Sequence, residues 1–266
     1  MLQERLTQED VGRLLGTVLT FYRSNRDPND FAKSDNRIYL HPRQRQEHQR
    51  NDGLLRAGHK IQALQDFLYE KKREWSDLER GQYIVENKIS YGNCTEMSLA
   101  ATYLCAIDEN FARKAQHTWL VLTTRHPDDL TVDSASDHTF VLISDNQDVS
   151  RRRLTMNLLN NAPAEAGLWI IDPWLKIACS ARDYSNHINQ KLEKWETIGK
   201  AIGSSMGEHG TVVPPEDSLS ETYTALKSSR LHLRKLAPPP LQHAFENTLR
   251  GTSQDLRQPS QGRKLH

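Results

Sequence analysis

The sequence is poor in cysteine. Only Cys94, Cys105 and Cys179 occur among its 266 residues, and none belongs to a Cys-x-x-Cys pair. An odd and sparse set of this kind does not predict a disulfide framework and is typical of a reducing compartment. No Cys or His pairs stand at the spacing of zinc ligands. We therefore expect no metal site.

Long apolar runs are also lacking. No stretch approaches the ~18 consecutive apolar residues of a membrane-spanning helix. Charged residues throughout 1–10 leave no apolar core for a Sec signal peptide. The mean hydropathy of −0.72 lies on the polar side for a globular protein. These features predict no membrane span and polar ends that flank a compact core. We also expect a monomer.

Neither sign of charge is in excess. The 35 Lys and Arg residues are balanced by 34 Asp and Glu residues, which argues against DNA or an anionic membrane as the main partner. Two basic segments, 41–53 and 151–153, could contact RNA. The first has no interleaved aromatic residues, so a solvated linker is the better interpretation. A Gly-rich phosphate loop and a dinucleotide fingerprint are both missing, and we predict no cofactor and no nucleic acid.

The pattern of apolar residues divides the chain into three regions. Residues 1–53 are a polar N-terminal extension with one short amphipathic helix, 54–203 form the core, and 204–266 are a C-terminal extension. In the last region we expect one helical stretch over 219–236 and then a disordered tail. Within the core, helical periodicity covers 54–78, 94–115 and 182–204, whereas short β-branched and aromatic runs over 117–124, 137–144 and 167–174 predict strands. The fold class is therefore α+β.

Three chemically competent residues stand at the ends of these predicted core elements. Cys94 opens a helix directly after Gly92-Asn93, His138 opens a strand, and Asp172 ends another strand before Pro173. Element ends are where side chains from a rigid scaffold reach a shared cleft. A thiol needs an imidazole or a helix N-terminus to become a thiolate, and the imidazole needs a carboxylate to orient it. The three residues together predict a Cys-His-Asp triad.

Each residue also has an ordinary structural interpretation. Cys94 alone could be a buried thiol, His138 a structural imidazole, and Asp172 a turn initiator before proline. Glu96 is a complication, because its charge near the helix start opposes a thiolate unless it points to solvent or pairs with a cation. Only the joint occurrence of the three residues favours catalysis.

The segments GNCTEMSLAATYL, DHTFVLI and WIIDPW resemble the nucleophile helix, histidine strand and aspartate strand of papain-like and transglutaminase-like cysteine enzymes. They are similar to bacterial effectors of that superfamily, the YopT-type proteases and the glutamine deamidases, over residues 90–175. Two departures are Trp174, where the YopT-type motif continues into Asn, and Thr95, where the transglutaminase pattern has Trp. The resemblance implies a nucleophile helix packed on a small antiparallel sheet with flanking helices.

By this resemblance Cys94 is the nucleophile, His138 the general base and acid, and Asp172 the orienting carboxylate. The implied function is an amide hydrolase or acyl transferase that acts on a protein. A protease and a glutamine deamidase stay open, with transglutaminase-type cross-linking as an alternative. The resemblance further implies a bacterial effector secreted into a host cell, whose substrate is a host protein. A protein-binding module without catalysis is the rival from another class.

Donors for an oxyanion are less well defined by the sequence. The backbone N–H of Cys94 is the safest candidate, because it lies at the predicted helix start. Gln82 and Asn87 lie upstream at a plausible distance for a side-chain donor, and Asn93 stands directly beside the nucleophile. Spacing does not select among these amides.

Overall fold

A computed structural model describes residues 4–25, 38–40, 47–124, 136–146, 148–149, 154–163, 166–198, 200–202, 205–206, 212–213 and 230–236. The chain divides into two units, 1–236 and 237–266, and the second lies entirely outside the described residues. Three predicted features lie outside the described residues: the disordered tail, the arginines at 151–153 and most of the helix over 219–236.

A five-stranded antiparallel sheet, with strand order β5-β4-β3-β2-β9, forms the centre of the described structure. Three of its strands were predicted from their short β-branched and aromatic runs. The strands are β2 (His117–Thr124), β3 (Ser136–Ser144), β4 (Leu168–Asp172), β5 (Ile177–Ser180) and β9 (Arg230–Lys235). The fold is thus α+β, as the sequence predicts.

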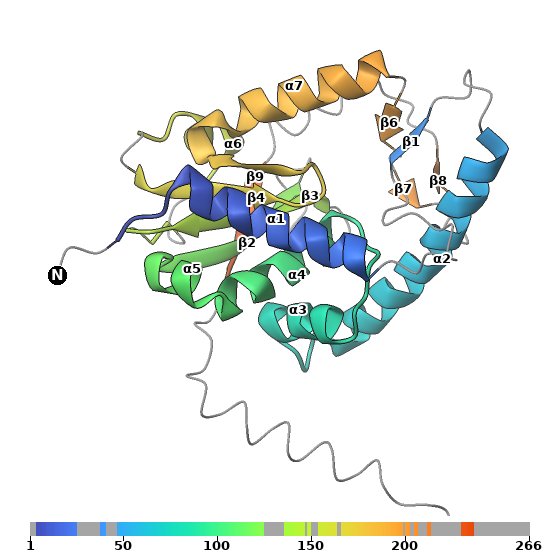
Figure 1. Cartoon of the computed structure of the whole chain (residues 1–266), viewed down its shortest axis with the longest axis horizontal. Helices are drawn as coiled ribbons and strands as arrows, with labels where there is room; N and C mark the ends of the chain where they lie inside the picture. Colours follow the sequence, from blue (N-terminus) through green and yellow to red (C-terminus); the bar gives the residue numbers. More distant parts are fainter. Residues whose placement is uncertain are drawn as a thin grey trace, which may run out of the picture. The chain divides into compact units, whose positions relative to one another are not determined.

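Helices pack around this sheet, and Figure 1 shows α1 lying against α4 and the end of the sheet formed by β4 and β5. Two short strand pairs are separate from this sheet, β1 with β6 and β7 with β8. The helices are α1 (Gln8–Ser24), α2 (Glu47–Lys71), α3 (Asp77–Glu86), α4 (Cys94–Ile107), α5 (Glu109–Lys114), α6 (Met156–Asn160), the 3₁₀ helix η2 (Ala181–Asp183) and α7 (Tyr184–Thr197). The short strands are β1 (Ile38–Leu40), β6 (Lys200–Ile202), β7 (Ser205–Met206) and β8 (Val212–Val213).

Two predicted helices are shorter in the structure. The helix predicted over 94–115 breaks at Asp108, whose carboxylate accepts a hydrogen bond from the backbone N–H of Phe111 and so starts α5 as a new helix. The helix predicted over 182–204 ends at Thr197. Residues 200–202 form instead a strand that pairs with β1.

The hydrophobic core extends past the boundaries predicted at 53 and 203. Val11, Leu14 and Val18 of α1 are fully buried in the same core as the sheet, and Leu231 of β9 joins it from the other end of the chain. Residues 230–235 were expected to be helical, but their apolar residues alternate with polar ones, and this period of two suits a strand paired with β2. Residues 47–53 of the predicted linker are the start of α2.

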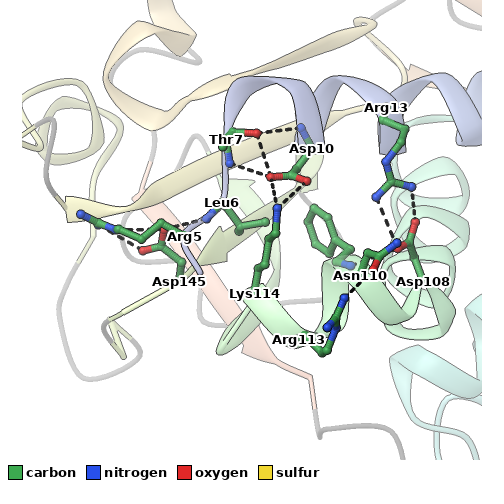
Figure 2. Close-up of polar contacts among 11 residues, drawn as sticks. Arg5, Leu6, Thr7, Asp10, Arg13, Asp108, Asn110, Arg113, Lys114 and Asp145 are labelled. Atoms are coloured by element: carbon green, nitrogen blue, oxygen red, sulfur yellow. Dashed lines mark hydrogen bonds and ion pairs between the residues drawn. The ribbon is translucent and has the colours of Figure 1, made fainter. Parts of the chain in front are cut away.

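Polar contacts fix α1 to the rest of the core, as Figure 2 shows. The buried carboxylate of Asp145 accepts hydrogen bonds from the backbone N–H of Leu6 at 3.1 Å and from the guanidinium of Arg5. Further along the helix, Lys114 pairs with Asp10 at 2.9 Å. The apolar face of α1 provides the contact area, and these polar pairs fix the position of the helix along that face.

No helix in the described part of the chain combines the length and the apolar character needed to cross a membrane.

Candidate active site

The backbone before α4 approaches its own helix closely. Gly92 is buried, and a Cβ at this position would lie 2.5 Å from Cβ of Glu96. The backbone N–H of Asn93 donates to Oε2 of Glu96 at 2.8 Å, which closes the first turn of the helix. The chain can make this tight entry because residue 92 is a glycine. As a result Cys94 becomes the first residue of α4.

Glu96 does not point to solvent, since only 2% of it is exposed. Its Oε2 caps the helix at Asn93, and its Oε1 accepts a hydrogen bond from the amide of Gln65 at 3.1 Å. The carboxylate builds the helix start that carries Cys94, but both of these donors are neutral, so neither offsets the negative charge that would oppose a thiolate.

Helix α4 is tied directly to the histidine strand. The hydroxyls of Thr95 and Thr139 are hydrogen-bonded at 3.0 Å, and Ser98 donates to the carbonyl oxygen of Thr139 at the same distance. Because Thr95 follows Cys94 and Thr139 follows His138, these bonds fix the two candidate catalytic residues relative to each other.

His138 and Asp172 meet across two neighbouring strands. Val141 of β3 pairs with Ile171 of β4, and this register brings the next residue, Asp172, diagonally towards His138. Nε2 of His138 lies 2.6 Å from Oδ2 of Asp172, a distance typical of a strong hydrogen bond. The other oxygen, Oδ1, accepts a hydrogen bond from the backbone N–H of Leu175 at 2.9 Å. The carboxylate is thus held at both oxygens.

Tyr184 is a member of the site that the sequence analysis missed. Its hydroxyl donates to Oδ2 of Asp172 at 2.7 Å, beside the histidine. The residue appeared in the sequence only as one apolar step in the helix over 182–204, and nothing in that pattern indicates a polar role for its hydroxyl. The indole of Trp174 also packs against the imidazole of His138, with ring centroids 5.5 Å apart.

Cys94 interacts with the same imidazole. Burial lowers the pKa of His138, but the charge and hydrogen bond of Asp172, together with the hydrogen bond and charge of Cys94, outweigh it and raise the pKa to about 10. Nδ1 of His138 is buried and makes no hydrogen bond of standard geometry to a described residue. Catalytic hydrogen bonds are often long or poorly aligned before substrate binds and tighten only in the complex.

The three residues are enclosed rather than open to a cleft. Cys94 is 3% exposed, His138 2% and Asp172 0%. We expected element ends to face a shared cleft, yet here the ends are covered by protein. A substrate carbonyl can reach the sulfur only if the residues around Cys94 move.

The structure separates the candidate oxyanion donors. The amide of Gln82 donates to Glu86 at 2.8 Å and the amide of Asn87 donates to the carbonyl of Tyr83 at 2.8 Å, so both are engaged within or at the end of α3. Asn93 and Cys94 are buried together at the start of α4. The backbone N–H of Cys94 belongs to the same residue as the sulfur and stays the first candidate, with Asn93 beside it.

The other two cysteines differ from Cys94 in their surroundings. Burial and the charge of Asp108 raise the pKa of Cys105, and burial with the charges of Asp183 and Asp172 raises the pKa of Cys179 to about 12. None of the three cysteines is in a disulfide. Among the described residues no group of three His, Cys, Asp or Glu side chains is arranged to hold a metal ion.

Comparison of the chain with protein-family models, with curated proteins and with solved structures gave no match.

Proposed function

We propose that the protein is a thiol acyl-transfer enzyme that attacks an amide of a protein substrate through Cys94, His138 and Asp172. The observation that carries the proposal is the buried 2.6 Å hydrogen bond between His138 and Asp172 on an imidazole that also interacts with Cys94. The order of the three groups is the one that nucleophilic catalysis requires: nucleophile, base and orienting carboxylate.

The raised pKa of His138 supports a particular charge state. With a pKa of about 10, the imidazole is protonated at neutral pH. An imidazolium beside a thiol at a helix N-terminus favours the thiolate, the reactive form of cysteine. Asp172, which accepts hydrogen bonds at both oxygens, compensates the positive charge of the ring.

The reaction follows from these groups. The Cys94 thiolate attacks the carbonyl carbon, a C–S bond forms, and the negative charge moves to the carbonyl oxygen, where the N–H of Cys94 can stabilise it. The C–N bond then breaks, and the imidazolium of His138 gives its proton to the leaving nitrogen. Water attacks the resulting thioester while His138 takes a proton from it, the C–S bond breaks, and a carboxylic acid is released.

The nature of the amide decides the outcome. A main-chain amide gives proteolysis, a glutamine carboxamide gives deamidation, and attack of an amine instead of water gives a cross-link. We favour hydrolysis of a protein, within the papain-like or transglutaminase-like superfamily that the motifs around the three residues resemble. A host protein as substrate of a secreted bacterial effector belongs to the same proposal.

Alkylation by iodoacetamide tests the thiolate directly. The protein is labelled across a range of pH, and mass spectrometry of its peptides compares Cys94 with Cys105 and Cys179 in the same molecule. We expect Cys94 to react fast well below the ~8.5 pKa of an ordinary thiol. The raised pKa of the other two thiols keeps them slow, so they serve as internal controls.

One variant separates the ionisation of Cys94 from its access to the reagent. Replacement of His138 by alanine should abolish the fast labelling of Cys94, whereas opening of the buried site alone would give a rate with the pH dependence of a free thiol. If Cys94 labels no faster at low pH than in His138→Ala, the proposal fails. Mass spectrometry of an incubated protein then distinguishes a cut, a gain of about one mass unit and a cross-link.

A further inference from the structure

The part of β3 that carries His138 is paired with a neighbouring strand on the β2 side only. Pairing of β3 with β4 covers residues 141–144 and ends before His138. On the β2 side the register slips by one residue, because Thr123 pairs with His138 whereas Thr124 pairs with Ser136. A bulge of this kind bends the strand and interrupts the ladder, and bulges are common beside active sites. The sheet alone therefore holds His138 less firmly than it holds the middle of β3.

Three hydroxyl side chains supply further contacts at this place. The hydroxyl of Thr123, in β2, donates to the carbonyl oxygen of His138 itself at 3.2 Å. From α4, Ser98 donates to the carbonyl oxygen of Thr139, and the hydroxyl of Thr95 is hydrogen-bonded to the hydroxyl of Thr139, both at 3.0 Å. We refer to these three residues as the hydroxyl bracket: Thr95, Ser98 and Thr123.

The hydroxyl bracket joins β2 and α4 to the same two residues of β3. Ser98, Thr123 and Thr139 are 0% exposed, and Thr95 is half-buried. A buried carbonyl that loses its donor pays the full cost of desolvation, so the two bonds to carbonyl oxygens are not easily exchanged. Two consecutive turns of the helix that begins at Cys94 are thus tied to the strand that carries His138.

The alignment of His138 with sulfur depends on these backbone contacts. Nε2 of the ring is fixed by Asp172 at 2.6 Å, whereas Nδ1 makes no hydrogen bond of standard geometry to a described residue. The distance from the ring to Cys94 is therefore set by where the backbone of His138 lies relative to the start of α4. Errors of about 1 Å in such an alignment can cost about a hundredfold in rate.

We propose that the hydroxyl bracket positions the imidazole of His138 for proton exchange with the sulfur of Cys94. This inference rests on the proposed function and names positioning residues for its reaction. The three residues act through His138 and Thr139. If they served only to satisfy buried polar groups, their loss would lower stability and leave the ionisation of Cys94 unchanged.

Replacement of Thr123 or Thr95 by valine tests this positioning, because valine removes the hydroxyl and keeps the branched shape. The rate of Cys94 alkylation by iodoacetamide is measured against pH for each variant. We expect the midpoint of the profile to rise by about one pH unit, so that labelling well below the midpoint falls about tenfold. Thr123→Ser and Thr95→Ser keep the hydroxyl and should restore the midpoint of the unaltered protein.

Thr102 provides the matched control. Its buried hydroxyl donates to the carbonyl oxygen of Leu99 at 2.6 Å, a bond that stays within α4. Thr102→Val should destabilise the protein, as urea unfolding measures, without moving the midpoint of the Cys94 profile. Valine variants of Thr123 and Thr95 that lose stability and keep the midpoint overturn the proposal. A midpoint that moves equally in Thr102→Val overturns it as well.

A second measurement does not require a reactive thiol. Burial lowers the pKa of His138, whereas Asp172 and Cys94 raise it, so a displaced imidazole in Thr123→Val should titrate at lower pH in an NMR experiment. If Cys94 proves unreactive while this titration still shifts, the proposed function fails and the positioning of His138 stands. If Cys94 reacts fast and neither measurement responds to the valine variants, only the positioning role is lost.

Discussion

Tyr184 and Asp172 form a hydrogen bond of 2.7 Å in the interior of the protein, at the same carboxylate oxygen that contacts His138 at 2.6 Å. Burial first, and then the charge of Asp172, raises the pKa of Tyr184 well above its ordinary value. The hydroxyl therefore stays protonated and acts as a donor. Tyr184 and His138 share one oxygen of Asp172. The tyrosine therefore orients the carboxylate, and its hydrogen bond partly offsets the negative charge that acts on His138.

Replacement of Tyr184 by phenylalanine removes this donor and keeps the ring. We expect the free energy of unfolding to fall by about 1.5–3 kcal/mol, the usual value of a hydrogen bond to a charged group. Asp172 would then bind the imidazole proton more strongly, so the pKa of His138 should rise further. Urea unfolding measures the first effect, and an NMR titration of the imidazole measures the second.

Tyr103 offers a matched control for this change. Its hydroxyl also faces a carboxylate, but the contact with Glu86 is long, at 3.5 Å, and only partly buried. Tyr103→Phe should cost less than about 1 kcal/mol and leave the titration of His138 unchanged. Equal losses in the two variants would show that Tyr184 contributes packing and no orientation of Asp172.

The sequence predicted the helices and strands in which apolar residues recur with a clear helical or strand period. The strand β2 was predicted with the bounds that it has, β3 and β4 within two residues at either end, and α4 with the correct first residue. Short β-branched runs and a Gly-Asn helix start are local signals, so they can be recognised without knowledge of the fold. The sequence placed His138 and Asp172 at the ends of two predicted strands, and the structure brings their side chains into contact.

What the sequence did not predict depends on contacts between distant segments. In the sequence Tyr184 is one of the apolar positions of a helix. Its hydroxyl reaches Asp172 only once α7 packs on the sheet, so the sequence could not indicate this contact. The strand β9 was predicted as helix although Leu231 and Leu233 alternate with polar residues. So short an alternation becomes a strand only by pairing with β2, which lies more than a hundred residues earlier in the chain. The enclosure of Cys94 likewise arises from packing, and spacing along the chain carries no signal for it.

The protonated imidazole of His138 should make stability depend on pH. Its pKa rises from 6.5 to about 10 on folding, so between these values the folded protein binds the proton more tightly than the unfolded chain does. The stabilisation is complete below pH 6.5 and is lost as the pH rises towards 10. Urea unfolding of the protein and of His138→Gln over this range should show their difference in free energy shrink with rising pH.

An exposed histidine provides the reference for that experiment. His187 lies on the solvent side of α7, and His187→Gln should follow the unaltered protein across the whole range. A difference between the protein and His138→Gln that stays constant, or grows, from pH 6.5 to 10 would contradict a charged imidazole in the folded state.

Gly92 should not tolerate a side chain. A Cβ there would lie 2.5 Å from Cβ of Glu96, so Gly92→Ala has to displace the first turn of α4. We expect a loss of about 1–3 kcal/mol, typical of overpacking, and slower alkylation of Cys94. In contrast, Gly12 in α1 has nothing within 4 Å of a Cβ, and Gly12→Ala should stabilise the helix by about 0.5–1 kcal/mol. Two glycine-to-alanine changes of opposite sign would exclude a general effect on the unfolded chain.

Asp145 should hold the start of α1 much more firmly than the exposed ion pair further along the helix does. Asp145→Ala leaves the backbone N–H of Leu6 buried without its acceptor, so we expect a loss of about 2–3 kcal/mol and faster hydrogen exchange at that amide. Arg13→Ala breaks the pair with Asp108, in which the arginine side chain is 45% exposed, and should cost less than about 1 kcal/mol. If the two changes cost the same, α1 is held by its apolar face alone and the buried carboxylate adds nothing to its attachment.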